Sequence, residues 1–336
     1  MARLLAKVLA EQQRAGLVRA RGLTLGDRQV PADLNLPVAL AQGSKIRFTL
    51  RTLQAALSCD HFIYDACHLA QIHRMPILSR KPSLAFICGI ELWENAKAGY
   101  VKSARRTTVL VSISRYTLAK TEQLHGRLPQ ARVCWLGTES DELPPPPKKN
   151  RFQTPEVLIV GRLCERYKGH HDLIACWPRV AAAVPEAVLR IVGSGPAMEA
   201  LQSDARQSPA AGRILFEGFV PDRALDSLYA QASVFAMPSR GEGFGLVYIE
   251  AMRHGLPVIA SVHDAAPEVV LDGQTGYTVN LDQADELPER IIHLLKNPGH
   301  AKQLGENGQQ RWREHFCYSA FRDRFQPILH EFLSSE

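Results

Sequence analysis

The sequence predicts an α/β protein made of two doubly wound domains that face a cleft. Three observations support this prediction. Short apolar runs rich in β-branched residues alternate with helix-length segments, this alternation occurs twice along the chain, and four consecutive prolines separate the two series. Strands that are apolar throughout are typical of parallel sheets covered by helices on both faces. Two such domains would bind a ligand between the carboxyl ends of their strands.

The first domain is predicted over residues 1–143. It opens on an amphipathic segment, "MARLLAKVLAEQQRAG", in which Lys7 interrupts the only apolar run. This segment lacks the cleavage site of a secretory signal, so we expect a helix and a cytosolic protein. The predicted strands follow at residues 17–25, 61–66, 83–88, 108–113 and 132–136.

The second domain is predicted over residues 156–316, after a linker at residues 144–155. The linker prediction depends on the segment "ELPPPPKKNRFQTP", because consecutive prolines form an extended spacer that cannot join a helix or a central strand. The predicted strands then restart at residues 156–161, 187–193, 213–218, 233–238, 256–261 and 276–280. A last segment, residues 317–336, contains an amphipathic helix pattern over 318–333.

The charge is distributed unequally between the two halves. Residues 1–150 contain 22 Lys and Arg against 11 Asp and Glu, whereas residues 151–336 contain 18 against 23. The basic half is consistent with peripheral contact with an anionic membrane or with a phosphate-bearing substrate, and equally with an ordinary solvated surface. The basic residues lack the interleaved aromatics of nucleic-acid binders, so no nucleic-acid partner is expected. No apolar run approaches the roughly 18 residues of a membrane span.

Cysteine and histidine patterns predict neither a metal site nor a cofactor. The seven cysteines form no Cys-x-x-Cys pair, and without a secretory signal they are expected to be reduced thiols. Neither His-Glu-x-x-His nor Asp-x-Asp occurs in the sequence.

Two glycine turns follow strands of the second domain. In "IVGRLCERYKGH", Gly161 and Arg162 follow a strand and Lys168 precedes a helix, so two cations flank a turn that could neutralise a diphosphate. Arg and Lys beside a turn are also common as plain surface residues. In "IVGSGP", Gly193 begins a turn that suits either a ligand contact or a positive φ. The third glycine of the dinucleotide fingerprint is absent, which disfavours a NAD-dependent oxidoreductase.

The stretch "RGEGFGLVYIEAMRHG" is predicted to present a helix N-terminus to a ligand. Glycines in the loop let a phosphate approach the backbone N–H groups at the start of the helix, where the helix dipole favours an anion. One carboxylate before this seat and one inside the helix could accept hydrogen bonds from a sugar and a ribose. The pattern therefore indicates a nucleotide sugar, with Glu242 on the sugar, Glu250 on the ribose, and the seat formed by Gly243, Phe244, Gly245 and Leu246. The apolar face of this helix is expected to consist of Leu246, Val247, Ile249 and Met252.

With "VGRLCERYKGHHDLI" upstream and "APEVVLDGQTGYTV" downstream, residues 218–261 resemble the retaining GT-B glycosyltransferases of family 4, the glycosyl transferases group 1. The resemblance implies a Glu-x7-Glu motif at Glu242 and Glu250. It also implies that Arg162 and Lys168 hold the donor diphosphate without a metal. The implied reaction transfers a hexose from a UDP- or GDP-sugar to a glycan, glycolipid or lipid-linked acceptor, with retention, as in polysaccharide biosynthesis. The leaving diphosphate would accept the acceptor's proton.

The first domain resembles this family more loosely. Many relatives have His-Gly-x-Glu-x-Trp where "FICGIELW" stands here, so Cys88 replaces a histidine, and Cys88, Gly89 and Glu91 become acceptor-side candidates. Relatives begin with a strand and a glycine-rich loop, so the first strand is expected to be missing here. Their last helix crosses back to the N-terminal domain, and the segment over 318–333 is expected to do the same. The missing secretory signal and the basic first half lead us to expect a cytoplasmic protein, peripheral at the inner face of the cell membrane.

Two other functions compete with transfer. A catalytically silent relative that binds a nucleotide sugar would share the same motifs, and Cys88 together with the early start favours it. A nucleotide-sugar epimerase of the same fold would instead carry acid and base side chains in place of the Glu-x7-Glu loop.

Overall fold

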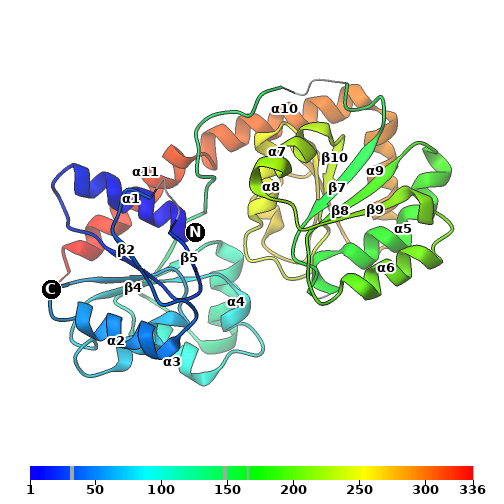
Figure 1. Cartoon of the computed structure of the whole chain (residues 1–336). Coiled ribbons are helices and arrows are strands. Elements are labelled where there is room, and N and C mark those ends of the chain that lie inside the picture. Colours follow the sequence, from blue (N-terminus) through cyan, green and yellow to red (C-terminus); the bar gives the residue numbers. More distant parts are fainter. Residues whose placement is uncertain (31–33, 147–149, 165, 336) are drawn as a thin grey trace. The chain divides into compact units, whose positions relative to one another are not determined.

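The computed structural model describes residues 1–30, 34–146, 150–164 and 166–335. The chain forms two compact units, Met1–Glu139 with Tyr318–Glu336, and Ser140–Cys317 (Figure 1). Each unit contains a parallel sheet, so the predicted α/β class is confirmed. The predicted linker, residues 144–155, includes residues 147–149, which lie outside the described residues. After that gap, Arg151 donates hydrogen bonds to three carbonyl oxygens of the second unit.

The described residues of the first unit contain two parallel sheets, ordered β3-β4-β5-β6 and β1-β2. The strands are β1 (Gly22–Thr24), β2 (Val38–Leu40), β3 (Phe62–Tyr64), β4 (Ser83–Ile87), β5 (Val109–Ser112) and β6 (Ala131–Val133). The helices are α1 (Ala2–Arg14), α2 (Lys45–Ala55), η1 (Leu69–Arg74), η2 (Ile90–Leu92), α3 (Ala98–Arg106), α4 (Arg115–His125) and α11 (Tyr318–Leu333).

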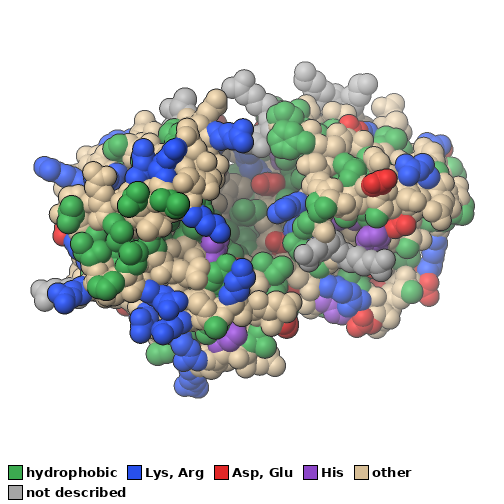
Figure 2. Space-filling model, turned by 60° about the horizontal axis from the view of Figure 1, so that its bottom comes forward, with side chains coloured by type: hydrophobic (Ala, Val, Ile, Leu, Met, Phe, Trp, Pro, Cys, Tyr) green, Lys and Arg blue, Asp and Glu red, His purple; other side chains and the backbone are tan. Residues whose placement is uncertain are grey.

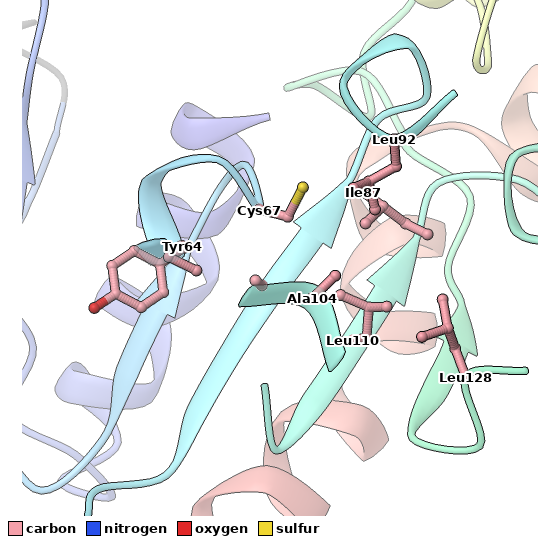
Figure 3. Close-up of a cluster of buried hydrophobic side chains, with 9 residues drawn as sticks. Tyr64, Cys67, Ile87, Leu92, Ala104, Leu110 and Leu128 are labelled. Atoms are coloured by element: carbon pink, nitrogen blue, oxygen red, sulfur yellow. The ribbon is translucent and has the colours of Figure 1, made fainter. Parts of the chain in front are cut away.

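The core of the first unit lies on the four-stranded sheet. Every residue of β4 and β5 is buried, as their continuous apolar runs predict. Figure 3 shows part of this core, with Tyr64 from β3, Ile87 from β4 and Leu110 from β5. Two serines, Ser44 and Ser114, cap α2 and α4 by accepting a backbone N–H of the first turn.

Helix α11 returns the end of the chain to the first unit. Its buried aromatic residues recur at helical spacing, as Phe321, Phe325 and Phe332 show. The ring of Phe325 lies 5.6 Å from that of Phe86 in β4, measured between centroids. The helix therefore covers a face of the four-stranded sheet.

The described residues of the second unit contain a six-stranded parallel sheet, ordered β12-β11-β10-β7-β8-β9. The strands are β7 (Glu156–Val160), β8 (Val188–Val192), β9 (Ile214–Gly218), β10 (Val234–Ala236), β11 (Val258–Ser261) and β12 (Gly276–Val279). The helices are η3 (Arg166–Lys168), α5 (His170–Ala183), α6 (Met198–Gln207), η4 (Ala211–Arg213), α7 (Asp222–Gln231), α8 (Leu246–Arg253), η5 (Ala266–Glu268), α9 (Glu286–Lys296) and α10 (Pro298–His315). Figure 1 shows helices on both sides of this sheet.

The strand order gives the second unit a topological switch point. The first three strands of the unit, β7, β8 and β9, extend the sheet in one direction, and the next three, β10, β11 and β12, extend it in the other. Strands β7 and β10 are neighbours, with Val157 paired to Val234. Ligands of such sheets bind beyond the carboxyl ends of the two strands where the order reverses.

Strand β2 was not predicted from the sequence. It contains three half-buried residues, and it pairs in parallel with β1, where Leu23 lies opposite Ala39. A run this short carries no periodic signal of its own. Its strand conformation depends on the pairing with β1, 14 residues or more away along the chain.

Candidate functional site

Two loops meet at the switch point of the second unit, one after β7 and one after β10. The N–H of Arg240 donates to the carbonyl oxygen of Tyr167 at 2.6 Å. Gly169 has a φ of +81° and lies so close to Pro238 that an added Cβ would stand 2.3 Å from its carbonyl oxygen. An added Cβ at Gly241 would stand 3.2 Å from the ring of Tyr167. The loops therefore pack as one structure, and only glycine fits at position 169.

Lys168 and Glu242 form an ion pair where these loops meet. Lys168 Nζ lies 2.6 Å from Glu242 Oε2, and the two side chains are only 15% and 20% exposed. The sequence predicted that both residues contact one ligand, and the structure brings them together from 74 positions apart. In such a partly buried pair each charge compensates the other, so removing one partner leaves the other uncompensated.

Asp264 holds the backbone of Glu242 from the neighbouring loop, after β11. Its Oδ2 accepts a hydrogen bond from the Glu242 N–H at 2.8 Å and one from the Ser239 hydroxyl, and its Oδ1 accepts one from the Ala266 N–H at 2.9 Å. Burial raises the pKa of Asp264 to about 6, and the Glu242 charge adds to this shift while the three hydrogen bonds oppose it. The sequence analysis missed Asp264, although its place directly after an apolar strand puts it at the same sheet edge.

Helices α5 and α8 both begin at this sheet edge. Their N-cap residues, Gly169 and Gly245, have φ values of +81° and +87°, and neither helix start is capped by a side chain. A Cβ at Gly245 would stand 2.2 Å from the ring of Tyr248. Two helix N-termini, each carrying about half a positive charge, thus flank the Lys168–Glu242 pair and favour an anion there.

The start of α8 differs in part from the sequence prediction. Leu246 and Val247 are half-buried, whereas Ile249 and Met252 are fully buried as expected, and Tyr248 is buried as well. The phenolic hydroxyl of Tyr248 donates to the carbonyl oxygen of Met237 at 2.8 Å, which places its ring under the loop after β10. The buried face of α8 therefore includes Tyr248, which was not predicted, and leaves Leu246 and Val247 only half-buried.

Phe244 lies between the two glycines of the loop, and its side chain belongs to the core. It is 1% exposed and packs edge-to-face on Phe316, with 5.9 Å between the ring centroids. Only the main chain of Phe244 is left to meet a ligand. Gly243 beside it is buried too.

Glu250 is held by a tyrosine that the sequence analysis did not single out. The Tyr229 hydroxyl donates to Glu250 Oε2 at 2.9 Å. The Tyr229 ring is 2% exposed and stacks on His254, with 5.2 Å between centroids and 21° between planes. His254 Nε2 in turn lies 3.0 Å from Asp226 Oδ1. These contacts fix the orientation of the Glu250 carboxylate on α8.

The turns after β7 and β8 lie against each other. Gly193 has a φ of +134°, and a Cβ added to it would stand 1.8 Å from the carbonyl oxygen of Gly161. The Gly161 N–H donates to the Val192 carbonyl at 3.0 Å. Arg162 follows on the exposed side, and among the described residues it makes no hydrogen bond or ion pair. Its guanidinium is thus available at this edge.

The acceptor-side candidates lie in the first unit, at the carboxyl end of β4. Glu91 Oε1 accepts the backbone N–H of Cys88 at 2.6 Å, so this carboxylate closes the turn that it belongs to. Burial raises the pKa of the Cys88 thiol, with Glu91 and Asp65 adding to the shift. Gly89 has a φ of +127° and its added Cβ would stand 2.7 Å from the Trp93 ring.

No metal centre emerges from the part of the chain that the structure describes. Within it, no three His, Cys, Asp or Glu side chains lie close enough together to hold an ion. The same residues contain no helix that is both long and apolar enough to span a bilayer.

Comparison with known proteins gives consistent matches. Residues 145–311 match the family described as "Glycosyl transferases group 1". The chain is 35% identical over 218 residues to a GDP-mannose-dependent α-(1-6)-phosphatidylinositol monomannoside mannosyltransferase of Mycolicibacterium smegmatis, covering 60% of this chain and 56% of the relative. It is 31% identical over 248 residues to a GDP-mannose-dependent monoacylated α-(1-6)-phosphatidylinositol monomannoside mannosyltransferase of Corynebacterium glutamicum, covering 68% and 63%. The matched region thus spans somewhat over half the length of these curated relatives.

Solved structures match the whole chain. HepE from Anabaena, in complex with UDP and glucose, aligns with a TM-score of 0.83 at 19% identity and covers 100% of this chain and 96% of its own. Sucrose-phosphate synthase from Thermosynechococcus elongatus aligns with a TM-score of 0.83 at 20% identity, covering 99% and 94%. At this identity the likeness concerns the fold, and it confirms the predicted GT-B class.

Proposed function

Because the chain belongs to the group 1 glycosyltransferases, we propose that it is a retaining enzyme that transfers a hexose from a nucleotide-diphosphate sugar to a glycan, glycolipid or lipid-linked acceptor. The proposed donor site lies at the switch point of the second unit. The proposed acceptor-side residues are Cys88, Gly89 and Glu91 in the first unit.

The observation that best supports this proposal is the Lys168–Glu242 pair. It joins a cation after β7 to a carboxylate after β10, at the sheet edge where ligands of such folds bind. The two uncapped helix starts beside it supply backbone N–H groups for an anion. When a diphosphate binds, the Lys168 ammonium would pair with it instead of with Glu242. The Glu242 carboxylate would then accept hydrogen bonds from the hydroxyls of the sugar.

The proposed reaction needs no protein nucleophile. The bond between the anomeric carbon and the donor phosphate oxygen breaks, and a bond from the acceptor oxygen to the same face of that carbon forms. The acceptor's proton passes to the departing phosphate oxygen. Arg162, Lys168 and the helix starts stabilise the charge that develops on the diphosphate, Glu242 orients the sugar, and Glu250, held by Tyr229, binds the ribose.

We propose that the reaction is independent of a metal ion and of any cofactor. A guanidinium, an ammonium and two helix N-termini supply the positive charge that a divalent cation would otherwise provide. Transfer should therefore persist after exhaustive treatment with EDTA. Loss of activity that only an added divalent ion restores would contradict this part of the proposal.

GDP-mannose is the first donor to test, because two of the relatives above are named as GDP-mannose-dependent. UDP-glucose is the second, because HepE is described in complex with UDP and glucose. In either case the donor carries the same diphosphate, so the site residues and their roles are unchanged.

We also propose a peripheral contact between the first unit and an anionic membrane at the cytoplasmic face. This unit contains 22 Lys and Arg against 12 Asp and Glu. On α2 and the turn after it, Ile46, Leu50 and Leu57 are 75%, 62% and 77% exposed and recur at helical spacing, with Arg51 exposed beside them. In Figure 2, where the first unit is at the left, hydrophobic side chains lie intermingled with Lys and Arg.

The membrane contact can be tested with vesicles of equal parts phosphatidylcholine and phosphatidylglycerol. The variant Ile46→Ser/Leu50→Ser should sediment with them about tenfold more weakly than the unchanged protein, because two apolar side chains no longer leave water. The control Leu17→Ser/Leu124→Ser also removes exposed apolar side chains of this unit, 63% and 43% exposed, and should bind like the unchanged protein. Equal weakening of both variants would contradict the assignment to α2.

The donor is best identified with a panel of nucleotide sugars, scored for thermal stabilisation and for hydrolysis or transfer of the sugar. A transferase should be stabilised by one donor and should consume it, whereas a silent nucleotide-sugar-binding relative would be stabilised without turnover. An epimerase would convert the donor without releasing the nucleoside diphosphate. If no nucleotide sugar of the panel stabilised the protein against thermal unfolding, the proposed function would be contradicted.

A further inference from the structure

A cavity of about 300 Å³ lies in the first unit, at the opposite edge of the sheet from the acceptor-side candidates. It is open to solvent and is lined by η1, by the C-terminal end of α3 and by Ser83, the first residue of β4. Cys88 follows the last residue of the same strand, five residues after Ser83, which at about 3.3 Å per residue puts it about 16 Å away. The cavity therefore takes no part in the proposed transfer site.

Two arginines line this cavity, and no acidic residue does so among the described residues. Arg74 comes from η1 and Arg106 from the last turn of α3. Within the described chain, neither guanidinium makes a hydrogen bond or an ion pair. Both side chains are exposed, and neither has an acidic partner at the cavity. Two such guanidinium groups at one cavity favour an anion, and their planar forks suit the oxygens of a phosphate.

Ser83 adds a third hydrogen-bond donor to the cavity. It is 2% exposed and lines the cavity, yet its hydroxyl makes no hydrogen bond to a described residue. Its backbone N–H is satisfied by Thr108 Oγ1 at 3.1 Å, so only the side chain lacks a partner. The Ser83 hydroxyl is open to the cavity, where it can donate a hydrogen bond to an acceptor oxygen.

Hydrogen bonds occupy part of the C-terminal end of α3, which lines the cavity. The Thr107 hydroxyl donates to the Ser103 carbonyl at 2.9 Å, and the Ser103 hydroxyl donates to the Gly99 carbonyl at 2.9 Å. Gln130 Nε2 covers the Ala104 carbonyl at 3.1 Å. Two of the last four carbonyl groups of α3, those of Ser103 and Ala104, thus accept hydrogen bonds, which reduces the partial negative charge at this helix end.

His73, which also lines the cavity, is already fully bonded. Its Nε2 donates to the Lys81 carbonyl at 2.8 Å, so its Nδ1 accepts the Tyr64 hydroxyl at 3.1 Å. Burial lowers the pKa of His73, which keeps the ring neutral. The free donors of the cavity are therefore the two guanidinium groups and the Ser83 hydroxyl.

We propose that this cavity is a second ligand site, which binds the phosphate group of a phosphorylated small molecule or of a phospholipid headgroup. Arg74 and Arg106 hold the phosphate oxygens from two sides, and the Ser83 hydroxyl donates a third hydrogen bond from the floor of the cavity. The site is independent of the transfer reaction, and it is present in the full chain without a donor.

Calorimetric titration with inorganic phosphate, at constant ionic strength with chloride as the background anion, tests the site. Relative to the unchanged protein, Arg74→Gln/Arg106→Gln should weaken phosphate binding by at least about tenfold, and Ser83→Ala by about threefold or more. The matched control is Arg80→Gln/Lys102→Gln, which removes the same charge from exposed neighbours outside the cavity and should leave the affinity unchanged. The proposal would be overturned if the two double variants weakened phosphate binding equally, or if neither variant changed the affinity for phosphate.

Two further titrations identify the source of the phosphate. One uses sn-glycerol 3-phosphate, and the other uses vesicles of equal parts phosphatidylcholine and phosphatidylglycerol, with phosphatidylcholine alone as the blank. Vesicle binding that is lost in Arg74→Gln/Arg106→Gln but kept in the control assigns the site to a lipid headgroup. If Arg74→Gln/Arg106→Gln instead loses glycerol 3-phosphate binding and keeps vesicle binding, the site is assigned to a soluble ligand. Either of these two outcomes supports a phosphate site.

Discussion

At the level of single residues, the Lys168–Glu242 pair is the most direct test of the donor site. Lys168→Met should lower the rate of transfer about 100-fold or more, because a cation that stabilises the leaving diphosphate is lost. It should also lower the free energy of unfolding by about 1–2 kcal/mol, since the largely buried Glu242 carboxylate loses its partner. Steady-state kinetics and urea unfolding measure the two effects.

Lys302 supplies the control for this substitution. It lies 3.6 Å from Glu306 on the exposed face of α10, with side chains 74% and 56% exposed. Such a surface pair contributes at most about 1 kcal/mol, so Lys302→Met should change neither rate nor stability measurably. Transfer by Lys168→Met at a rate close to that of Lys302→Met would remove Lys168 from the proposed mechanism.

Tyr229 gives a second prediction at the same scale. Tyr229→Phe keeps the ring on His254 but removes the hydroxyl that orients Glu250, so binding of a nucleoside diphosphate should weaken about fivefold or more. The turnover number should change little, because the ribose is remote from the bond that breaks. Calorimetry and kinetics separate the two effects.

Tyr277→Phe is the matched control for Tyr229→Phe. The Tyr277 hydroxyl, on β12, bonds to His300 on α10 in the same unit, and within the described residues it makes no hydrogen bond to α8. Nucleoside diphosphate binding should be unchanged in this variant. If Tyr229→Phe bound the nucleotide as tightly as Tyr277→Phe, Glu250 would not depend on this hydroxyl.

At the level of elements, the start of α8 depends on a glycine. Gly245→Ala requires a left-handed φ of +87° and places a Cβ 2.2 Å from the Tyr248 ring. The substitution should lower the free energy of unfolding by more than about 1 kcal/mol and also weaken donor binding, because the helix start shifts. Thermal unfolding with and without the donor measures both.

Gly212 offers a comparison within the same unit. Nothing lies within 4 Å of a Cβ added there, so Gly212→Ala should change stability by no more than about 0.5 kcal/mol. Donor binding should be the same as in the unchanged protein. Equal stability of the two alanine variants would show that α8 tolerates another residue at its N-cap.

At the level of the whole molecule, two buried histidines predict how stability depends on pH. Burial lowers the pKa of His170 and of His254 to about 4. In the unfolded chain each histidine titrates near 6.5. Below that pH the unfolded state therefore binds protons at these two side chains, whereas the native state keeps them neutral. Acidification from pH 7 to 5 should therefore lower the free energy of unfolding, by about 1–2 kcal/mol for each histidine.

Asp264 acts in the opposite direction but does not reverse this trend. Its pKa of about 6 lies above that of an unfolded aspartate, so the native state gains a proton on acidification. One such carboxyl offsets about one of the two histidines. Urea unfolding at the two pH values should thus still show a net loss of stability.

His170→Leu tests the assignment to a named residue. Neither ring nitrogen of His170 has a hydrogen-bond partner among the described residues, so leucine removes no bond there. The variant should lose much of the decrease in stability between pH 7 and 5. His171→Gln, which changes the neighbouring ring beside Asp204, should retain it. An unchanged pH dependence in His170→Leu would contradict the prediction.

Much of the second unit could be predicted from local patterns. Each of its six observed strands lies within a predicted apolar run. A central strand such as β10, which is buried throughout, must be apolar along its length. In the first unit β2 was missed, and the predicted strand at 17–25 shrank to Gly22–Thr24. Short, half-buried strands depend on their partner more than on their own residues.

The candidate site was predictable only in part. Glu242, Glu250, Arg162 and Lys168 could be named, because charged residues beside glycines at strand ends are visible in the sequence. The partners of these residues could not be named, because each contact joins segments that are 21 to 74 positions apart in the chain. Lys168 pairs with Glu242, Asp264 bonds to the backbone of Glu242, and Tyr229 bonds to Glu250. The roles of these residues stay predictions that the variants above test.

By itself, the sequence determined the α/β class, and it predicted two domains and the residue types that a nucleotide sugar would need. Those features follow from the spacing of apolar residues, glycines and charges within one element, which each segment carries alone. Only the tertiary structure decided which carboxylate pairs with which cation, which face of α8 is buried, and that Arg74, Arg106 and Ser83 share one cavity. Such contacts exist only after distant segments pack together, because the free energy of burying a polar group depends on the partner that folding brings to it.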